Sequence, residues 1–232
     1  RTIGISVTAS NDAPTKTGTN PSFTAPEDDA APAGKTVTTL FGGNFSDAKD
    51  TVTSGSSANT LAGVAITGMS NQKGVWEYNS GSGWVAVPTD VADNKAFVLT
   101  ATDQLRFRST TADYNGTPTD TLTVRLIDSS VAAVSGARPD LSGVNSGGKT
   151  QYSDASNAIT LGALVTPIND TPTLTAGGLT TGIAITATES GTLTGAGNAF
   201  EVALLTATAV ADLDLASTPG LTAGTFGGGS IT

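Results

Sequence analysis

The chain of 232 residues contains no cysteine and no histidine. The first absence excludes disulfide bridges and thiolate metal sites. Together they leave zinc and copper without their preferred protein ligands. No imidazole is present to act as a general base, and no Gly-x-Ser-x-Gly elbow occurs, so neither part of a serine-hydrolase site can be assembled. We therefore expect that the chain is not an enzyme.

Aromatic residues and charged residues are also scarce, at 5% and 13% of the chain. Threonine, serine, glycine and alanine fill the sequence instead, and the glutamate, lysine and leucine that build long helices are few. This composition is typical of many short strands joined by glycine and asparagine turns. It predicts an all-β chain.

The chain has 11 lysines and arginines but 20 aspartates and glutamates, which gives a net charge of −9. Such a surface repels nucleic acid and anionic lipid and attracts soluble cations. Calcium, which takes oxygen ligands, is the metal best suited to a chain without His or Cys. No run of about 18 apolar residues is present, so we expect no membrane insertion.

A motif near the start of the chain returns much later. Residues 11–15 read Asn-Asp-Ala-Pro-Thr and residues 169–173 read Asn-Asp-Thr-Pro-Thr. The preceding segments 2–8 and 160–166 also align, which gives an offset of 169 − 11 = 158 residues. A period of that size is typical of tandem domains. We expect three parts: the closing strand of a preceding module (1–10), a complete module (11–170), and the beginning of a second, incomplete module (171–232).

Strand-like patterns fill the complete module. A hairpin is predicted from Gly74–Tyr78 and Trp84–Val87, with a five-residue loop between them. Residues 131–149 are rich in Gly, Ser and Ala and predict a long exposed loop. Further strands are expected at 35–41, 61–69, 95–100, 104–108, 122–126 and 159–165.

Four motifs occur in a fixed order: Asn-Asp-x-Pro-Thr, the acidic Glu27-Asp28, the stretch 99–107, and Ala112-Asp113-Tyr114-Asn115-Gly116-Thr117 ahead of a strand. In this they resemble the cadherin-like and immunoglobulin-like repeats of giant bacterial surface adhesins, the RTX adhesins and related exoproteins. The resemblance covers residues 11–170 well and 171–232 weakly. It implies antiparallel Greek-key β-sandwich modules in tandem, with calcium at the junctions between them.

The resemblance also implies which residues bind calcium. Asn169 and Asp170 would act at the downstream junction, with Asp103 from the preceding loop and Glu189, Asp212 and Asp214 from the next module. Asn11, Asp12, Glu27 and Asp28 would serve the upstream junction. The chain departs from the strongest calcium signatures, since it has no Asp-x-Asp-x-Asp-Gly loop and Gly227-Gly228-Gly229 lacks the aspartate of the calcium-binding nonapeptide.

Two competing interpretations concern the acidic residues. Asn-Asp-x-Pro can be a simple turn, in which Asn and Asp bond their own backbone and Pro sets the next φ angle. Asp47, Asp50 and Asp128 are expected to be solvated loop acids without a role in binding.

The expected function is an extracellular extender repeat of a bacterial surface protein, stiffened by calcium and supporting adhesion or biofilm. Its partners would be neighbouring modules of the same polypeptide or neighbouring subunits. One alternative is a filament or sheath subunit that donates the strand Arg1–Thr8 to another chain. A second is a carbohydrate-binding module in which Trp76, Tyr78 and Trp84 stack on surface glycans, although core packing is the simpler interpretation of these aromatic residues.

Overall fold

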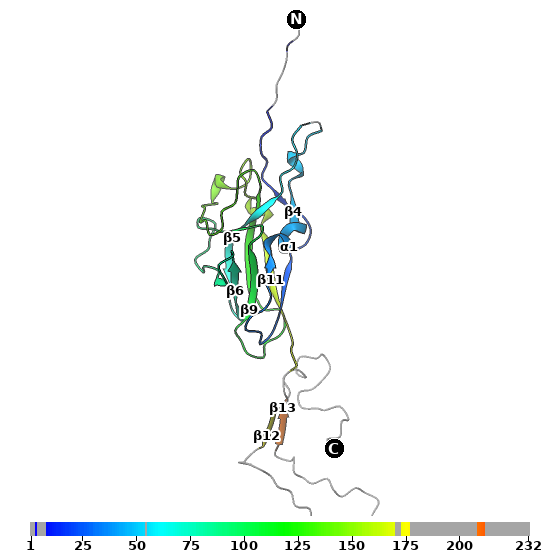
Figure 1. Ribbon diagram of the computed structural model, residues 1–232, viewed down its shortest axis with the longest axis vertical. Helices are drawn as coiled ribbons and strands as arrows, with labels where there is room; N and C mark the ends of the chain where they lie inside the picture. Colours follow the sequence, from blue (N-terminus) through cyan, green and yellow to red (C-terminus); the bar gives the residue numbers. More distant parts are fainter. Residues whose placement is uncertain (1–2, 4–7, 54, 170–172, 177–207, 212–232) are drawn as a thin grey trace, which may run out of the picture. The chain divides into compact units, whose positions relative to one another are not determined.

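The computed structural model describes residues 3, 8–53, 55–169, 173–176 and 208–211. The chain divides into two compact units, Arg1–Pro167 and Ile168–Thr232, and each is described by itself. Strands dominate the residues that the structure describes, as the composition predicts (Figure 1).

Two sheets and a short strand pair form the first unit. The larger sheet has the order β2 (Ser22–Pro26), β11 (Ile159–Thr166), β10 (Thr121–Asp128), β5 (Leu61–Ser70), β8 (Phe97–Thr100). The smaller one has the order β3 (Lys35–Thr36), β9 (Gln104–Ser109), β6 (Gly74–Asn79), β7 (Val85–Ala86). The pair joins β1 (Thr15–Lys16) to β4 (Phe45–Ser46), and the helical turns are α1 (Val37–Phe41), η1 (Gly42–Asn44), η2 (Ala48–Asp50), η3 (Gly143–Asn145) and η4 (Ala155–Asn157).

A single apolar cluster joins the two sheets. Phe23 from the larger sheet contacts Trp76 from the smaller one, with ring centroids 6.1 Å apart. Trp76 also packs on Phe107 at 5.1 Å, and all three side chains are fully buried. Large aromatic side chains contribute much of the burial energy in a core with so few of them.

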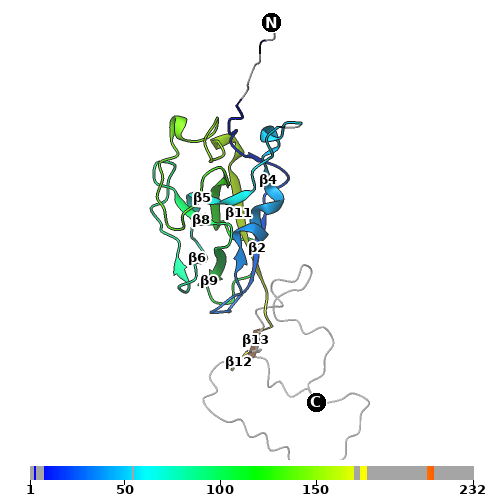
Figure 2. The ribbon, with the colours of Figure 1, turned by 45° about the horizontal axis from the view of Figure 1, so that its top comes forward.

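The neighbouring strands β2 and β11 of the larger sheet run parallel, whereas an antiparallel arrangement is expected from the sequence. Ser22 pairs with Gly162 and Pro26 with Thr166. The other pairings in this sheet are antiparallel. Because β2 and β11 run in the same direction, the chain arrives at one end of the unit and leaves at the other (Figure 2).

The strand predicted at 35–41 is wrong beyond Thr36, where the short helix α1 begins. Thr36 caps this helix by accepting a hydrogen bond from the Thr39 N–H at 3.1 Å. Val37, Leu40 and Phe41 are buried, a spacing of i, i+3 and i+4 that suits one face of a helix. By contrast, the predicted hairpin is confirmed, and Asn79 Oδ1 closes its loop by accepting two backbone N–H bonds.

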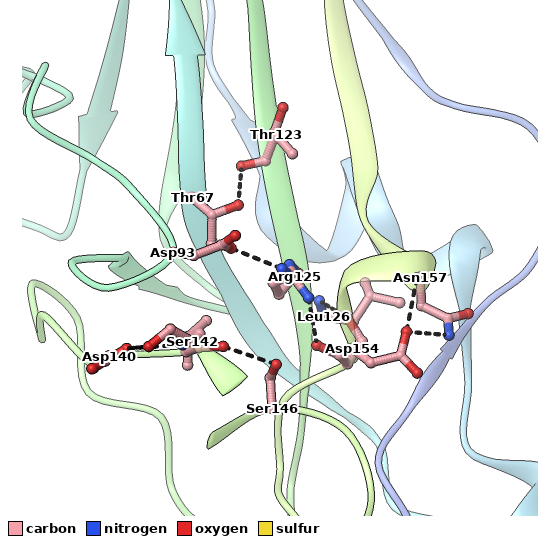
Figure 3. Close-up of polar contacts among 12 residues, drawn as sticks. Thr67, Asp93, Thr123, Arg125, Leu126, Asp140, Ser142, Ser146, Asp154 and Asn157 are labelled. Carbon is pink, nitrogen blue, oxygen red and sulfur yellow. Dashed lines mark hydrogen bonds and ion pairs between the residues drawn. The ribbon is translucent and has the colours of Figure 1, made fainter. Parts of the chain in front are cut away.

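Residues 131–149 do not form a simple exposed loop. Gly136 and Ala137 exchange backbone hydrogen bonds with Val98 of β8, the edge strand of the larger sheet. Leu141 is buried in a second apolar cluster with Ala65, Ala96, Val98 and Ile127. On the same side, Arg125 donates to Asp93 Oδ1 at 2.7 Å (Figure 3). The segment therefore covers an edge and a face that would otherwise expose apolar surface.

In the second unit, β12 (Thr173–Ala176) pairs antiparallel with β13 (Thr208–Ala211). Thr173 lies opposite Ala211, just as Thr15 lies opposite Ser46 in the first unit. The offset of 158 residues places Thr173 on Thr15, whereas Ala211 lies 211 − 46 = 165 residues after Ser46, so the strand pair resembles β1 with β4 but has a longer connection. An aspartate follows each pair in the sequence, Asp47 after Ser46 and Asp212 after Ala211.

Candidate cation site

Three aspartates gather where the chain enters the first unit. Asp47, Asp50 and Asp128 have exposed fractions of 4%, 7% and 0%, so the expectation of solvated loop acids is wrong. Asp47 follows β4, Asp50 ends η2 and Asp128 ends β10. The pairing of β4 with β1 and the length of β10 bring these three positions to the same end of the unit. We refer to Asp47, Asp50 and Asp128 as the aspartate cluster.

The entering chain is hydrogen-bonded to this cluster. Asn11 Nδ2 donates to Asp128 Oδ2 at 3.2 Å. The Asp12 N–H donates to Asp50 Oδ1 at 2.8 Å. Asn59 bridges the partners, since its Nδ2 donates to Asp50 Oδ2 and to Asn11 Oδ1, both at 2.9 Å. Asn11 and Asp12, both predicted from the sequence as ligands, are thus held against acids that the prediction left out.

Negative charge in the cluster is only partly compensated. Burial raises the pKa of Asp47, and the nearby Asp50 and Asp128 raise it further, against the lowering effect of a backbone hydrogen bond from Asn59. That bond, from the Asn59 N–H to Asp47 Oδ2, is 2.6 Å long. The other oxygen, Asp47 Oδ1, is buried without a hydrogen-bond partner, and none of the ion pairs among the described residues involves the cluster. A buried, unpaired carboxylate oxygen is costly, and a cation would remove that cost.

The donor set suits a hard cation. Carboxylate, amide and backbone carbonyl oxygens are the ligands of calcium. Within the described residues no three acidic side chains already converge on one point, because the Asn11 and Asn59 amide groups lie between the carboxylates. An asparagine amide can rotate to present its oxygen in place of its NH2. Rotation of these two amides would convert the cluster from hydrogen-bonded to cation-binding.

An open hollow reaches the cluster from solvent. Asp12 and Asp50 line it together with Lys49, Val52 and Ser56. Because Asp50 belongs to both the hollow and the cluster, a hydrated ion can approach the cluster through it.

A neighbouring loop, residues 143–150, lies against the entering chain. Residues 143–150 read Gly-Val-Asn-Ser-Gly-Gly-Lys-Thr, which matches the pattern of nucleotide phosphate loops. Those loops connect a strand to a helix and direct backbone N–H groups at the phosphate. Here the loop directs carbonyls at the entering chain: Gly148 O accepts from the Ala13 N–H at 2.8 Å, and Lys149 O and Thr150 O accept from Asn11. Carbonyl oxygens suit a cation and not a phosphate.

Glu27 and Asp28 lie at the opposite end of the unit, so the structure does not bring them to Asn11 and Asp12. Glu27 is fully buried, and its N–H donates to Thr166 O, the end of β11, at 2.9 Å. Asn115 Nδ2 donates to Glu27 Oε2 at 3.3 Å. Of the predicted ligands, these two therefore lie where the chain leaves the unit.

The remaining predicted ligands fall into two groups. Asp103 is a turn residue between β8 and β9, where its Oδ2 accepts from the Thr100 N–H at 2.8 Å. Asn169 is exposed and belongs to the second unit. Outside the described residues are Asp170, Glu189, Asp212 and Asp214.

The aromatic residues proposed to stack on glycans do not form a platform. Trp76 is completely buried in the core, as the simpler interpretation predicts, and Tyr78 packs on Phe97 at 4.9 Å. Trp84 is stacked against the Arg106 guanidinium at 4.3 Å. Tyr78 and Trp84 are both half-buried.

No family model, curated protein or solved structure matches the chain. The described part of the chain also contains no helix of the length and hydrophobicity needed to cross a membrane. The aspartate cluster and the course of the chain are the two structural features from which a function can be proposed.

Proposed function

We propose that the first unit is a structural extender module of a large bacterial surface protein, located outside the cell and repeated in tandem. The observation that carries this proposal is the position of its two ends. The chain arrives beside Asp128, at the end of β10, and leaves through Val165, which pairs with Gly116 ahead of the start of β10. A module built in this way adds length each time it is repeated.

The added length follows from strand geometry. β10 has eight residues, so at roughly 3.3 Å per residue it separates the two ends by about 26 Å. Loops beyond the strand increase this separation. Modules joined end to end then project whatever they carry away from their anchor, which is the mechanical task of an extender.

Support for tandem repetition comes from two independent patterns. The Asn-Asp-x-Pro-Thr motif recurs after 158 residues, and in both units the strand that begins at its threonine pairs antiparallel with a later strand, β1 with β4 and β12 with β13. On this basis we interpret the two packed sheets as a β-sandwich of Greek-key type that begins again after Asn169.

We further propose that calcium binds the aspartate cluster and fixes the entering chain. When bound, the ion supplies positive charge that offsets the repulsion among three buried carboxylates. Asn11 and Asp12 come from the entering chain, whereas Asp47, Asp50, Asn59 and Asp128 come from the body of the module. A ligand set shared in this way resists bending at the junction and stabilises the folded form by mass action.

The two rival functions have less support. Strand donation between chains would use residues 1–8, most of which lie outside the described residues. Glycan stacking would need an aromatic platform, and Trp76 lies in the core instead. The carbohydrate alternative would therefore need a weaker site around the partly exposed Trp84.

Thermal unfolding tests the calcium part of the proposal. The melting temperature of the chain is measured at neutral pH in excess chelator, in calcium, and in magnesium at the same ionic strength. We expect calcium to raise it and magnesium to raise it less, because a flexible set of carboxylates and carbonyls favours the larger ion. Equal melting in chelator and calcium would rule out a cation site with any effect on stability.

A further inference from the structure

The Asn115-Gly116 segment ahead of β10 contains a reactive pair of residues that the extender function does not use. An asparagine side chain can be attacked by the backbone nitrogen of the following residue. Glycine at that position offers the least obstruction, since it has no Cβ and tolerates conformations closed to other residues. Gly116 has a φ of +120°, inside the region that glycine alone adopts readily.

The fold holds both partners of this reaction in hydrogen bonds. The Gly116 N–H donates to Val165 O at 2.8 Å, and the Val165 N–H donates back to Gly116 O at 2.8 Å. The Asn115 side chain is held separately, because its Nδ2 donates to Glu27 Oε2 at 3.3 Å. The attacking nitrogen is therefore engaged as long as β11 remains paired with Gly116.

We propose that Asn115 is a site of spontaneous deamidation which the Gly116–Val165 pairing keeps closed. When the pairing opens, the Gly116 nitrogen loses its proton and bonds to Asn115 Cγ. The bond from Cγ to Nδ2 breaks and ammonia leaves. Water then opens the succinimide ring at either carbonyl, which leaves aspartate or isoaspartate at position 115. The reaction consumes one water and needs no oxidant or catalyst.

The product loosens the end of the module from which the chain leaves. Aspartate at position 115 would replace a hydrogen-bond donor to the buried Glu27 with a second carboxylate. Two carboxylates so close together cannot both remain ionised without cost. Isoaspartate would also add a backbone atom and shift Gly116 out of register with Val165. The modification therefore acts in one direction, toward release of β11.

Peptide mass spectrometry tests the proposal on the whole chain. The protein is incubated at mildly alkaline pH, folded in buffer and unfolded in urea, and deamidation is followed at Asn115 and at the Asn-Ser pairs Asn79-Ser80 and Asn145-Ser146. We expect Asn115 to react fastest in urea and to be slowed at least about tenfold by folding, since local opening limits the reaction. Equal rates in buffer and urea would overturn the protective role of the pairing. A urea rate no higher than that of the Asn-Ser pairs would overturn the site itself.

Two variants test the consequence. Asn115→Asp mimics the product, and Asn115→Gln keeps the amide while lengthening the side chain, which disfavours ring closure. We expect Asn115→Asp to melt below both the wild type and Asn115→Gln, and hydrogen exchange at Gly116 and Val165 to be faster in Asn115→Asp alone. If Asn115→Asp melts and exchanges like the wild type, deamidation does not release β11.

Discussion

Replacing Asp47 with asparagine should have opposite effects on stability in chelator and in calcium. The substitution keeps the size and shape of the side chain, and its oxygen can still accept the Asn59 N–H bond. It removes one negative charge from the aspartate cluster. It also replaces the unpartnered Oδ1 with an NH2 group that can donate toward Asp50 or Asp128.

The magnitudes follow from this exchange. A buried, unsatisfied polar atom costs about 1–3 kcal/mol, so Asp47→Asn should gain about 1 kcal/mol in chelator. That gain corresponds to roughly 2–4 °C in melting temperature for a domain of this size. Calcium at a hundred times its dissociation constant stabilises the wild type by about 2.7 kcal/mol, or roughly 5–10 °C. Most of that increment should be lost in the variant.

The pH dependence of the folding stability gives a second test of the same variant. The folded pKa of Asp47 is raised above its ordinary value of 3.8, so the folded state favours the protonated form. Its contribution to stability is present at low pH and is lost as pH rises through the folded pKa. In chelator, the wild type should lose stability over that range, and Asp47→Asn should lose less.

Thermal unfolding of both proteins in chelator and in calcium is the assay, with Asp29→Asn as the matched control. Asp29 is a half-buried aspartate outside the cluster, and its Oδ1 accepts a hydrogen bond from the Ala31 N–H that an asparagine oxygen can also accept. The Asp29→Asn variant therefore has the same net charge as Asp47→Asn. We expect Asp47→Asn to melt above the wild type in chelator and below it in calcium, whereas the control follows the wild type in both. Parallel shifts of Asp47→Asn in the two conditions would refute the reasoning.

Four further substitutions test other parts of the structure. Asp120 is fully buried and accepts backbone N–H bonds from residues 72–74. Because Asp120→Asn turns an NH2 group toward these donors, the free energy of unfolding measured in urea should fall by about 3 kcal/mol. A loss below about 1 kcal/mol would show that the turn is held by other contacts. Asp93 is 53% exposed but pairs with the buried Arg125. Asp93→Ala should therefore lower the free energy of unfolding by about 3 kcal/mol. A loss near 0.5 kcal/mol, which is typical of surface substitutions, would contradict the importance of this pairing. Trp84→Ala should leave the fold intact and should not change binding on a glycan array. Trp76→Ala should lower the free energy of unfolding by about 3–5 kcal/mol. Loss of glycan binding in a folded Trp84→Ala variant would support the carbohydrate alternative.

Local patterns in the sequence predict most of the strands. The hairpin around Asn79 follows from its turn residues, and Leu105 and Phe107 face the core as their alternation predicts. The helix α1 was missed because the apolar residues between 35 and 41 also fit a strand, and only the Thr36 cap distinguishes the two. The parallel pairing of β2 with β11 depends on contacts 140 residues apart, which no local pattern encodes.

The candidate site was only half predictable for the same reason. The repeated motif identifies Asn11 and Asp12, because their spacing is a property of the sequence alone. Asp47 and Asp128 look like loop acids in isolation, and their burial follows from strand pairings distant in the chain. One signal could have found Asp47: an aspartate directly follows β4 in the sequence, as Asp212 directly follows β13.

Small-angle X-ray scattering of a tandem duplication of residues 11–168, compared with a single copy in calcium, tests the central claim most directly. If the chain enters and leaves at opposite ends, the second copy should increase the maximum dimension by about one module length, at least about 26 Å from β10 alone, while the cross-section stays the same. Chelator should shorten the average dimension, because the junction then bends freely. A duplicated chain that widens without lengthening would show that the modules pack side by side, and the extender function would be wrong.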